Sequence, residues 1–209
     1  MTSKFSRIFY FLALLFLICP VQADDIGREL VDARAIFLQG VDGDRQAVRK
    51  ATKRFRTLSL RYPENPVFLA YLGASMTLQG RDAQNNLDKQ RLTEAGLKKI
   101  ERALKQLPED NGEHSAIYLD TQLVAASSFI YIPAFFNRYE RGQRLLQAIL
   151  EHHDFNRMAA AFRAATYFSA ALVARGNEDD DEYRRYLTLT AATDPQGRDG
   201  RSAKKLLQQ

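Results

Sequence analysis

Cysteine is almost absent from this sequence, because Cys19 is the only one among 209 residues. It lies in an N-terminal segment that we predict to be removed, so the remaining chain can form neither a disulfide nor a thiolate metal site. Strand-like alternation of apolar and polar residues is also missing, and valine and isoleucine are few. These absences exclude a disulfide-stabilised fold, a cysteine-based zinc site and a β-rich domain.

The N-terminal segment has the pattern of a secretory signal peptide. Lys4 and Arg7 precede an apolar run over residues 8–19, and a small residue, Ala23, ends the pattern. As a helix the run would span roughly 18 Å, short of the ~30 Å hydrocarbon core. We therefore predict a signal peptide over 1–23, cleavage after Ala23 and a periplasmic location. A lipoprotein is not expected, because Ile18 stands where its signal has a small residue.

Removal of residues 1–23 leaves 186 residues, takes away two of the thirty Lys and Arg residues and lowers the net charge from +5 to +3. This length predicts one domain over 24–209 that can bury a sizeable core. The charge is too small to indicate nucleic acid as a partner.

Apolar residues recur at spacings of three and four, which predicts an all-α chain. Gly40, Gly80 and Gly176 stand where left-handed C-caps are expected, and residues 110–113 form a predicted N-cap. The expected helices are Ile26–Gln39, Arg45–Arg61, Pro66–Gln79, Leu92–Leu107, Glu113–Phe129, Pro133–His152, Met158–Arg175 and Asp180–Thr193, with a weaker one after Gly200.

An internal repeat accompanies this helical pattern. Pro63 and Pro108 are followed and preceded by matching apolar positions, and the stretches FLAYLGASMTLQG and EAGLKKIERALKQLPED resemble a tetratricopeptide repeat, a helix–turn–helix unit of about 34 residues. The wider spacing of this chain implies an insertion near Asp82 to Gln90. The stretch FIYIPAFFNRYERGQRLLQAIL also resembles exported bacterial proteins of similar helical layout. The positions that match the packing residues of the repeat are Leu72, Gly73, Gly80, Gly96, Ile100, Ala103 and Pro108.

The resemblance implies antiparallel helix pairs stacked as a short right-handed solenoid of about three or four degenerate units. Each pair has an apolar face that only a neighbouring pair can cover, and stacking leaves a concave surface suited to binding. We therefore expect a scaffold or adaptor that binds a protein or peptide partner in the bacterial cell envelope.

Two stretches of the sequence are candidate contact sites. One is aromatic and surrounds Pro133: Phe129 and Tyr131 precede the predicted partner-binding residues, which are Phe135, Phe136, Asn137, Arg138 and Tyr139. Aromatic residues are core by default, but exposed ones could form a groove for a small molecule or glycan, the alternative function. The other is the cationic stretch Arg45–Arg61, which is a solvated helix face or a contact with a membrane surface or an acidic partner.

No set of residues in the sequence predicts catalysis, a cofactor or a metal. Ser75 sits mid-helix and lacks the second glycine of a nucleophile elbow, so we interpret it as a packing residue. His152 and His153 are adjacent and would point about 100° apart on a helix, which does not suit a shared metal. Glu140 or Glu151 could act as an acid or base in an envelope enzyme, but neither has a predicted second group. The expected protein is therefore not an enzyme, and its oligomeric state is left open.

Overall fold

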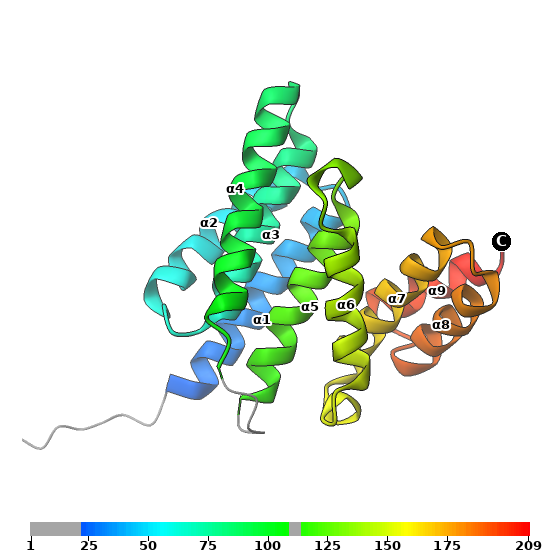
Figure 1. Cartoon of the computed structure of the whole chain (residues 1–209). Coiled ribbons are helices and arrows are strands. Elements are labelled where there is room, and N and C mark those ends of the chain that lie inside the picture. The colour runs from blue at the N-terminus through cyan, green and yellow to red at the C-terminus, as the bar shows by residue number, and fades with distance from the viewer. Residues whose placement is uncertain (1–21, 109–113) are drawn as a thin grey trace, which may run out of the picture.

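The computed structural model describes residues 22–108 and 114–209, and within them every regular element is helical (Figure 1). The all-α prediction is confirmed. Predicted features at 1–21 and at 109–113, which include most of the signal peptide and the N-cap at 110–113, lie outside the described residues. The elements are α1 (Gln22–Val41), α2 (Arg45–Arg61), α3 (Pro66–Asp82), α4 (Asn86–Lys105), α5 (Ser115–Tyr131), η1 (Ala134–Phe136), α6 (Tyr139–Glu151), η2 (Phe155–Arg157), α7 (Ala160–Gly176), α8 (Asp180–Thr193) and α9 (Arg198–Leu207).

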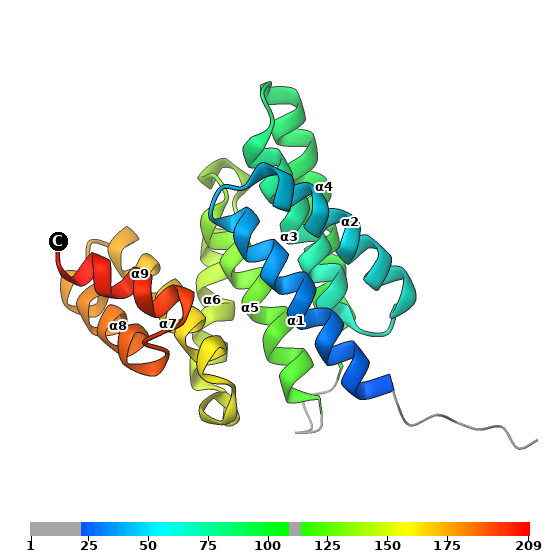
Figure 2. The same ribbon diagram turned by 180° about the vertical axis from the view of Figure 1, so that it is seen from behind.

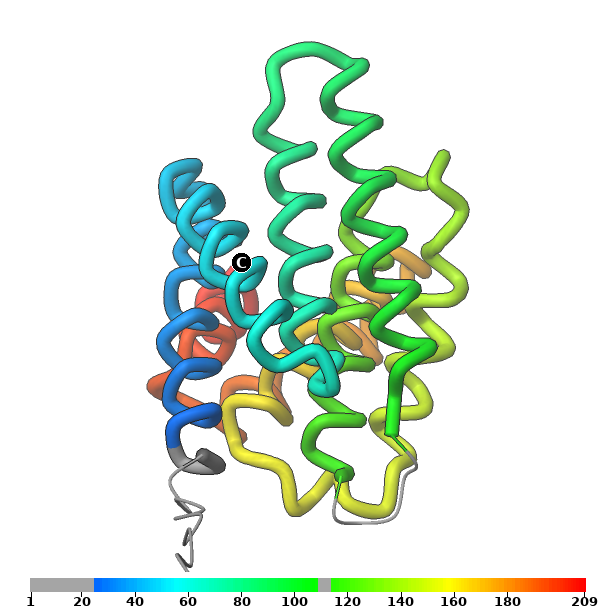
Figure 3. The backbone as a smooth tube through the Cα atoms, turned by 90° about the vertical axis from the view of Figure 1, so that its left-hand side faces the viewer, coloured from blue at the N-terminus to red at the C-terminus, as the bar shows by residue number. Residues whose placement is uncertain are grey.

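The helices pack mainly against their neighbours along the chain (Figures 1 and 2). Helices α1 and α2, α3 and α4, α5 and α6, and α7 and α8 form contacting pairs, and the odd-numbered helices also contact one another in sequence from α1 to α9. The α3–α4 pair projects beyond the helices around it (Figure 3). None of the helices in the described part is long and apolar enough to cross a membrane.

Local capping explains the helix boundaries that the sequence predicts correctly. The Asp44 carboxylate accepts hydrogen bonds from the backbone N–H groups of Gln46 and Ala47 at 2.7 and 3.0 Å, and α2 has its predicted bounds. These two bonds hold the pKa of Asp44 below its ordinary value. Asp179 caps α8 in the same way, by accepting from the N–H of Glu182. Both helices therefore begin where a carboxylate satisfies their first N–H groups.

The predicted glycine caps are wrong. Gly40 and Gly80 lie inside helices, Gly176 is the last residue of α7, and none of them has a positive φ. A Cβ at Gly40 would lie 2.9 Å from Val48 Cγ2, one at Gly80 would collide with Thr93, and one at Gly176 would lie 2.7 Å from the Tyr139 hydroxyl. These glycines permit close packing rather than a left-handed turn. The left-handed residues among those described are Gly43, Asn137 and Glu178.

The expected insertion at Asp82 to Gln90 is not a loop between two helices. Helix α3 continues to Asp82, α4 begins at Asn86, and Asn85 caps α4 by accepting from the N–H of Asp88 at 2.8 Å. The extra residues lengthen both helices, which is why this pair projects from the molecule.

The α3–α4 pair is held by backbone contact. A Cβ at Gly73 would lie 2.6 Å from the Gly96 carbonyl oxygen, and one at Gly96 would lie 2.5 Å from the Gly73 carbonyl oxygen. Leu72, Ile100 and Ala103 are buried around this contact. Of the repeat-packing residues, only Pro108 lies outside the two helices, and it is half-buried.

A polar network joins the first three odd-numbered helices. Arg34 of α1 forms an ion pair with Asp120 of α5 at 2.8 Å, and its guanidinium lies 5.4 Å from the centre of the buried Tyr71 ring of α3. Burial raises the pKa of Tyr71 to about 12, against the opposing effect of Arg34. The neighbouring Phe55 ring stacks on Tyr71 at 4.8 Å.

The end of α1 is a junction for distant helices. Arg81 of α3 donates to the carbonyl oxygens of Gly40 and Val41 at 2.9 and 3.2 Å. Arg198, at the start of α9, forms an ion pair with Asp42 at 2.7 Å. Cations are favourable at a helix C-terminus, where carbonyl groups lack intrahelical partners. The first and last helices are therefore tied together through one helix end.

Candidate binding site

The predicted partner-binding segment does not form one continuous helix with α6. The expected helix Pro133–His152 is interrupted, because Asn137 adopts a left-handed conformation with φ 52° between η1 and α6. Asparagine tolerates this conformation better than most residues, so it suits the turn. Asn137 therefore has a structural reason for its place.

Long-range ion pairs fix the start of α6. Glu101 of α4 pairs with Arg138 at 3.2 Å and also with Arg141. Arg141 in addition lies 5.5 Å from the centre of the buried Phe129 ring. Arg138, a predicted partner-binding residue, is thus engaged in anchoring this segment.

The aromatic residues of the segment divide between core and surface. Phe129 is fully buried, and Phe136 and Tyr139 are half-buried, with the Tyr139 hydroxyl close to Gly176. Tyr131 and Phe135 are 60% and 68% exposed. The default interpretation as core therefore holds for Phe129, and only Phe135 offers a large exposed apolar group among the five predicted residues.

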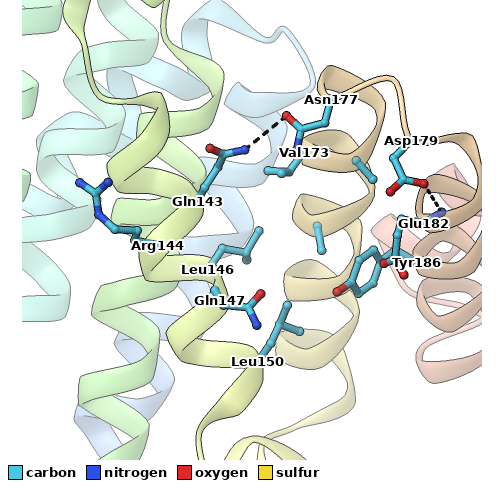
Figure 4. A pocket seen from close by; sticks show the side chains of 12 residues that line it. Gln143, Arg144, Leu146, Gln147, Leu150, Val173, Asn177, Asp179, Glu182 and Tyr186 are labelled. Atoms are coloured by element: carbon cyan, nitrogen blue, oxygen red, sulfur yellow. Dashed lines mark hydrogen bonds between the residues drawn. The ribbon is translucent and has the colours of Figure 1, made fainter.

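A groove opens beside this segment, between α6 on one side and α7 and α8 on the other (Figure 4). Its volume is about 370 Å³, within the range of ligand-binding clefts. Apolar side chains from α6 and α7 form part of its lining, and polar side chains surround them. The lining residues are Gln143, Arg144, Leu146, Gln147, Leu150, Ala170, Val173, Ala174, Asn177, Asp179, Glu182 and Tyr186.

The charged groups of the groove have partners within the chain. Asp179 caps α8, and Glu182 forms a bidentate pair with Arg185 at 2.9 and 2.6 Å. Of the carboxamides, Gln143 donates to Asn177 at 3.5 Å, across the groove (Figure 4). Gln147 donates to Glu151 at 2.5 Å. Carboxamides offer both donors and acceptors, so they can bind a ligand's amide or hydroxyl groups.

Sequence reasoning missed this groove because three helices contribute to it. Gln143, Gln147 and Leu150 do share one face of α6 at spacings of four and three. That pattern indicates an amphipathic helix but does not show that a gap lies opposite. The gap depends on the small side chains of α7, such as Ala170 and Ala174, which are far away in the sequence.

A histidine cluster lies at the other end of α6. The helix ends at Glu151, so His152 and His153 are not on a helix and do not point about 100° apart. Their rings stack at 4.4 Å. Together with Asp154 they place three potential ligand atoms within 4.8 Å of one another.

Hydrogen bonds within the turn already account for this arrangement. His152 Nδ1 accepts from the backbone N–H of Asp154 at 3.1 Å. Asp154 accepts from the Ser115 hydroxyl at 2.8 Å and from Arg157 at 3.1 Å, and these bonds lower its pKa. A metal ion here would compete with these hydrogen bonds for His152 Nδ1 and the Asp154 carboxylate. The cluster is better explained as a stabilised turn.

The residues considered for catalysis lie apart. Ser75 is fully buried and donates to the Tyr71 carbonyl oxygen at 2.8 Å, as a packing residue inside a helix does. Glu140 is exposed and lies 3.8 Å from Arg144, whereas Glu151 accepts from Gln147 at the opposite end of α6.

Comparison with models of protein families, with curated proteins and with solved structures finds no match for this chain.

Proposed function

We propose that this protein is an exported helical-repeat scaffold that binds a protein or peptide partner in the bacterial cell envelope. We propose that the helix pairs are degenerate tetratricopeptide-like units that stack as a short right-handed solenoid. The contacts within each pair, and the contacts between successive odd-numbered helices, support this proposal.

The groove between α6 and α7–α8 is the proposed docking site. The proposal rests on the presence of this groove. An extended peptide presents amide groups at regular intervals, which Gln143, Gln147 and Asn177 can satisfy. Its apolar side chains can pack on Leu150 and Val173. Burial of such side chains in a small cleft concentrates binding energy in few contacts.

Peptide selection against the immobilised protein tests this proposal. Gln143→Ala/Gln147→Ala should weaken binding of the selected peptides by at least tenfold, because two hydrogen-bonding groups are lost. Gln90→Ala/Gln106→Ala is the matched control, since both residues are exposed glutamines on or directly after α4. Equal affinity of both variants for the selected peptides would exclude the groove as the docking site.

A small-molecule or glycan ligand is the second candidate. The Tyr186 ring borders the groove beside the carboxamides, and such a combination suits a compact polar ligand. Thermal unfolding in the presence of saccharides and metabolites distinguishes the two, because a ligand raises the midpoint only when present well above its Kd. A shift that Gln147→Ala abolishes would favour this candidate over a peptide.

The proposed export has its own measurement. Mass spectrometry of the protein from the periplasmic fraction should give a chain that begins at Asp24. An intact N-terminus in the cytoplasmic fraction would contradict cleavage after Ala23.

A further inference from the structure

Positive charge is concentrated on a single helix of this protein. Helix α2 carries seven cations and no acid, whereas the whole chain has a net charge of +5. The rest of the chain is therefore net negative by two charges. Such an uneven distribution orients a protein in the field of a charged surface, and it cannot be attributed to a generally basic composition.

The cations of α2 fall into two groups. Arg54 and Arg61 pair with Glu29 of α1 at 3.3 and 3.0 Å. The other five are exposed and form no ion pair with any acid in the described part of the chain: Arg45, Arg49, Lys50, Lys53 and Arg56.

Most of the second group lies in one straight row. At 100° per residue, Arg45, Arg49, Lys53 and Arg56 fall within about 80° of the helix circumference, and Leu60 falls in the same row. The row is about 22 Å long, from the rise of 1.5 Å per residue. Leu60 is 77% exposed, so the row ends in an apolar side chain that the described residues leave largely uncovered. We name these five residues the α2 row.

The opposite face of α2 is buried against the rest of the molecule. Ala51, Phe55 and Leu58 point into the core with α1 and α3, so the α2 row faces outward. In Figure 1 the helix lies at the edge of the molecule, away from α7–α9. A plane can therefore approach Lys53, Arg56 and Leu60 without meeting the C-terminal helices, whereas Arg45 and Arg49 line a cleft against the α3–α4 pair.

The acids nearest the start of the row are already engaged. Asp44 accepts from two backbone N–H groups, Asp82 pairs with Arg81 at 2.8 Å, and Asp88 pairs with Arg91 at 2.9 Å. Within the described residues, none of these three acids forms an ion pair with Arg45 or Arg49.

We propose that the α2 row docks on an anionic lipid surface. A line of exposed cations suits a plane of phosphate headgroups, since basic residues near such a surface each add attraction. Leu60 enters the boundary between headgroups and acyl chains. An acidic protein partner is less suited, because protein hot spots gather in desolvated pockets. This inference is independent of the proposed groove.

Vesicle co-sedimentation tests the proposal with the full chain. Binding is expected to vesicles of phosphatidylcholine mixed with phosphatidylglycerol, and none to pure phosphatidylcholine. Arg45→Gln/Arg49→Gln/Lys53→Gln/Arg56→Gln should reduce the partition coefficient at least tenfold. The control Arg184→Gln/Arg201→Gln/Lys204→Gln/Lys205→Gln removes the same charge from exposed positions of α8 and α9 and should change it less than threefold. Equal losses in the two variants would overturn the proposal.

A fluorescent reporter locates the contact, because the chain contains no tryptophan. Leu60→Trp should show a blue-shifted emission on addition of the anionic vesicles, as the indole leaves water. Leu87→Trp is the matched control, since Leu87 is also 77% exposed but lies at the tip of the α3–α4 pair. Equal shifts at both positions, or a shift at neither, would contradict docking through the α2 row.

Two further arms separate the lipid surface from other anions. Soluble glycerol phosphate should not displace the protein from vesicles, whereas raised salt should release it, because the Debye length falls from ~10 Å at 0.1 M to ~3 Å at 1 M. Displacement by glycerol phosphate at low salt would indicate a free-phosphate site. Tighter binding to soluble polyglutamate than to vesicles would indicate an acidic protein partner. Either result would overturn the proposal.

Discussion

Two helix contacts in this protein differ in kind: the one between α3 and α4, and the one between α6 and α7. Gly73 and Gly96 face each other, so the first pair is in contact through its backbones. In the second pair, Leu146 and Gln147 stand opposite alanines of α7, and a groove remains. Gly142 brings α6 close to α5, where a Cβ would lie 3.0 Å from the Ala126 carbonyl oxygen.

The difference indicates a division of roles. Backbone contact leaves no room for a ligand, so the α3–α4 pair is best explained as scaffold. Long side chains that face small ones leave a cleft that a ligand can enter.

The largest expected effect comes from filling the backbone contact. Gly73→Leu should lower the free energy of unfolding by about 3 kcal/mol, because its Cβ alone would lie 2.6 Å from the Gly96 carbonyl oxygen. Gly27→Leu is the control, since a Cβ at this exposed helical position would meet no atom within 4 Å. It should be neutral or slightly stabilising. Urea unfolding of both variants measures the difference, and equal midpoints would refute the role of the glycine contact.

The next largest effect is a loss of stability at alkaline pH. It concerns the α3–α4 scaffold, because Tyr71 lies in α3. Its pKa is about 12 in the folded chain against an ordinary value of about 10, so the folded state holds the proton more tightly. Stability is full below pH 10 and falls as the pH rises toward 12, by about 2–3 kcal/mol at 1.36 kcal/mol per pKa unit. The Tyr71→Phe variant should not show this fall in the free energy of unfolding at alkaline pH. Urea midpoints measured on both sides of pH 10 for the two proteins test it, and an unchanged pH profile would count against it.

A smaller effect is expected where the end of α1 is tied to the start of α9. Asp42 and Arg198 are 156 residues apart, and both side chains are partly exposed, so the pair should contribute about 0.5–1 kcal/mol. Because Arg198 also pairs with Asp199, a double-mutant cycle of Asp42→Asn and Arg198→Gln is needed to isolate the coupling. A coupling that does not decrease at high salt would argue against an ionic origin.

Local signals account for what the sequence predicted well. Asp44 and Asp179 mark the starts of α2 and α8 through bonds to residues only two or three positions away, and both helices have the predicted bounds. The glycine caps were predicted wrongly, as Gly80 shows. The residues beside it in the sequence are compatible both with a helix C-cap and with a packing contact. Thr93 and Lys89, on another helix, show which of the two applies.

The candidate site was predicted less well for the same reason. The start of α6 is held by Glu101, more than thirty residues earlier, through its ion pairs with Arg138 and Arg141. The groove depends on the distance between α6 and α7, which no periodicity within either helix records. Periodicity identifies a face but not what lies opposite it.

The smallest expected effect distinguishes two buried serines, one in each region. The Ser75 hydroxyl bonds only to a carbonyl of its own helix, so Ser75→Ala should change stability by less than about 0.5 kcal/mol, since the better helix propensity of alanine offsets the lost bond. The Ser169 hydroxyl lies in addition 3.2 Å from that of Ser127 on α5, so Ser169→Ala should cost about 1 kcal/mol. Urea midpoints measure both, with affinity for the selected peptides as a second readout. A Ser75→Ala protein that is stable but no longer binds those peptides would show that Ser75 serves function rather than packing.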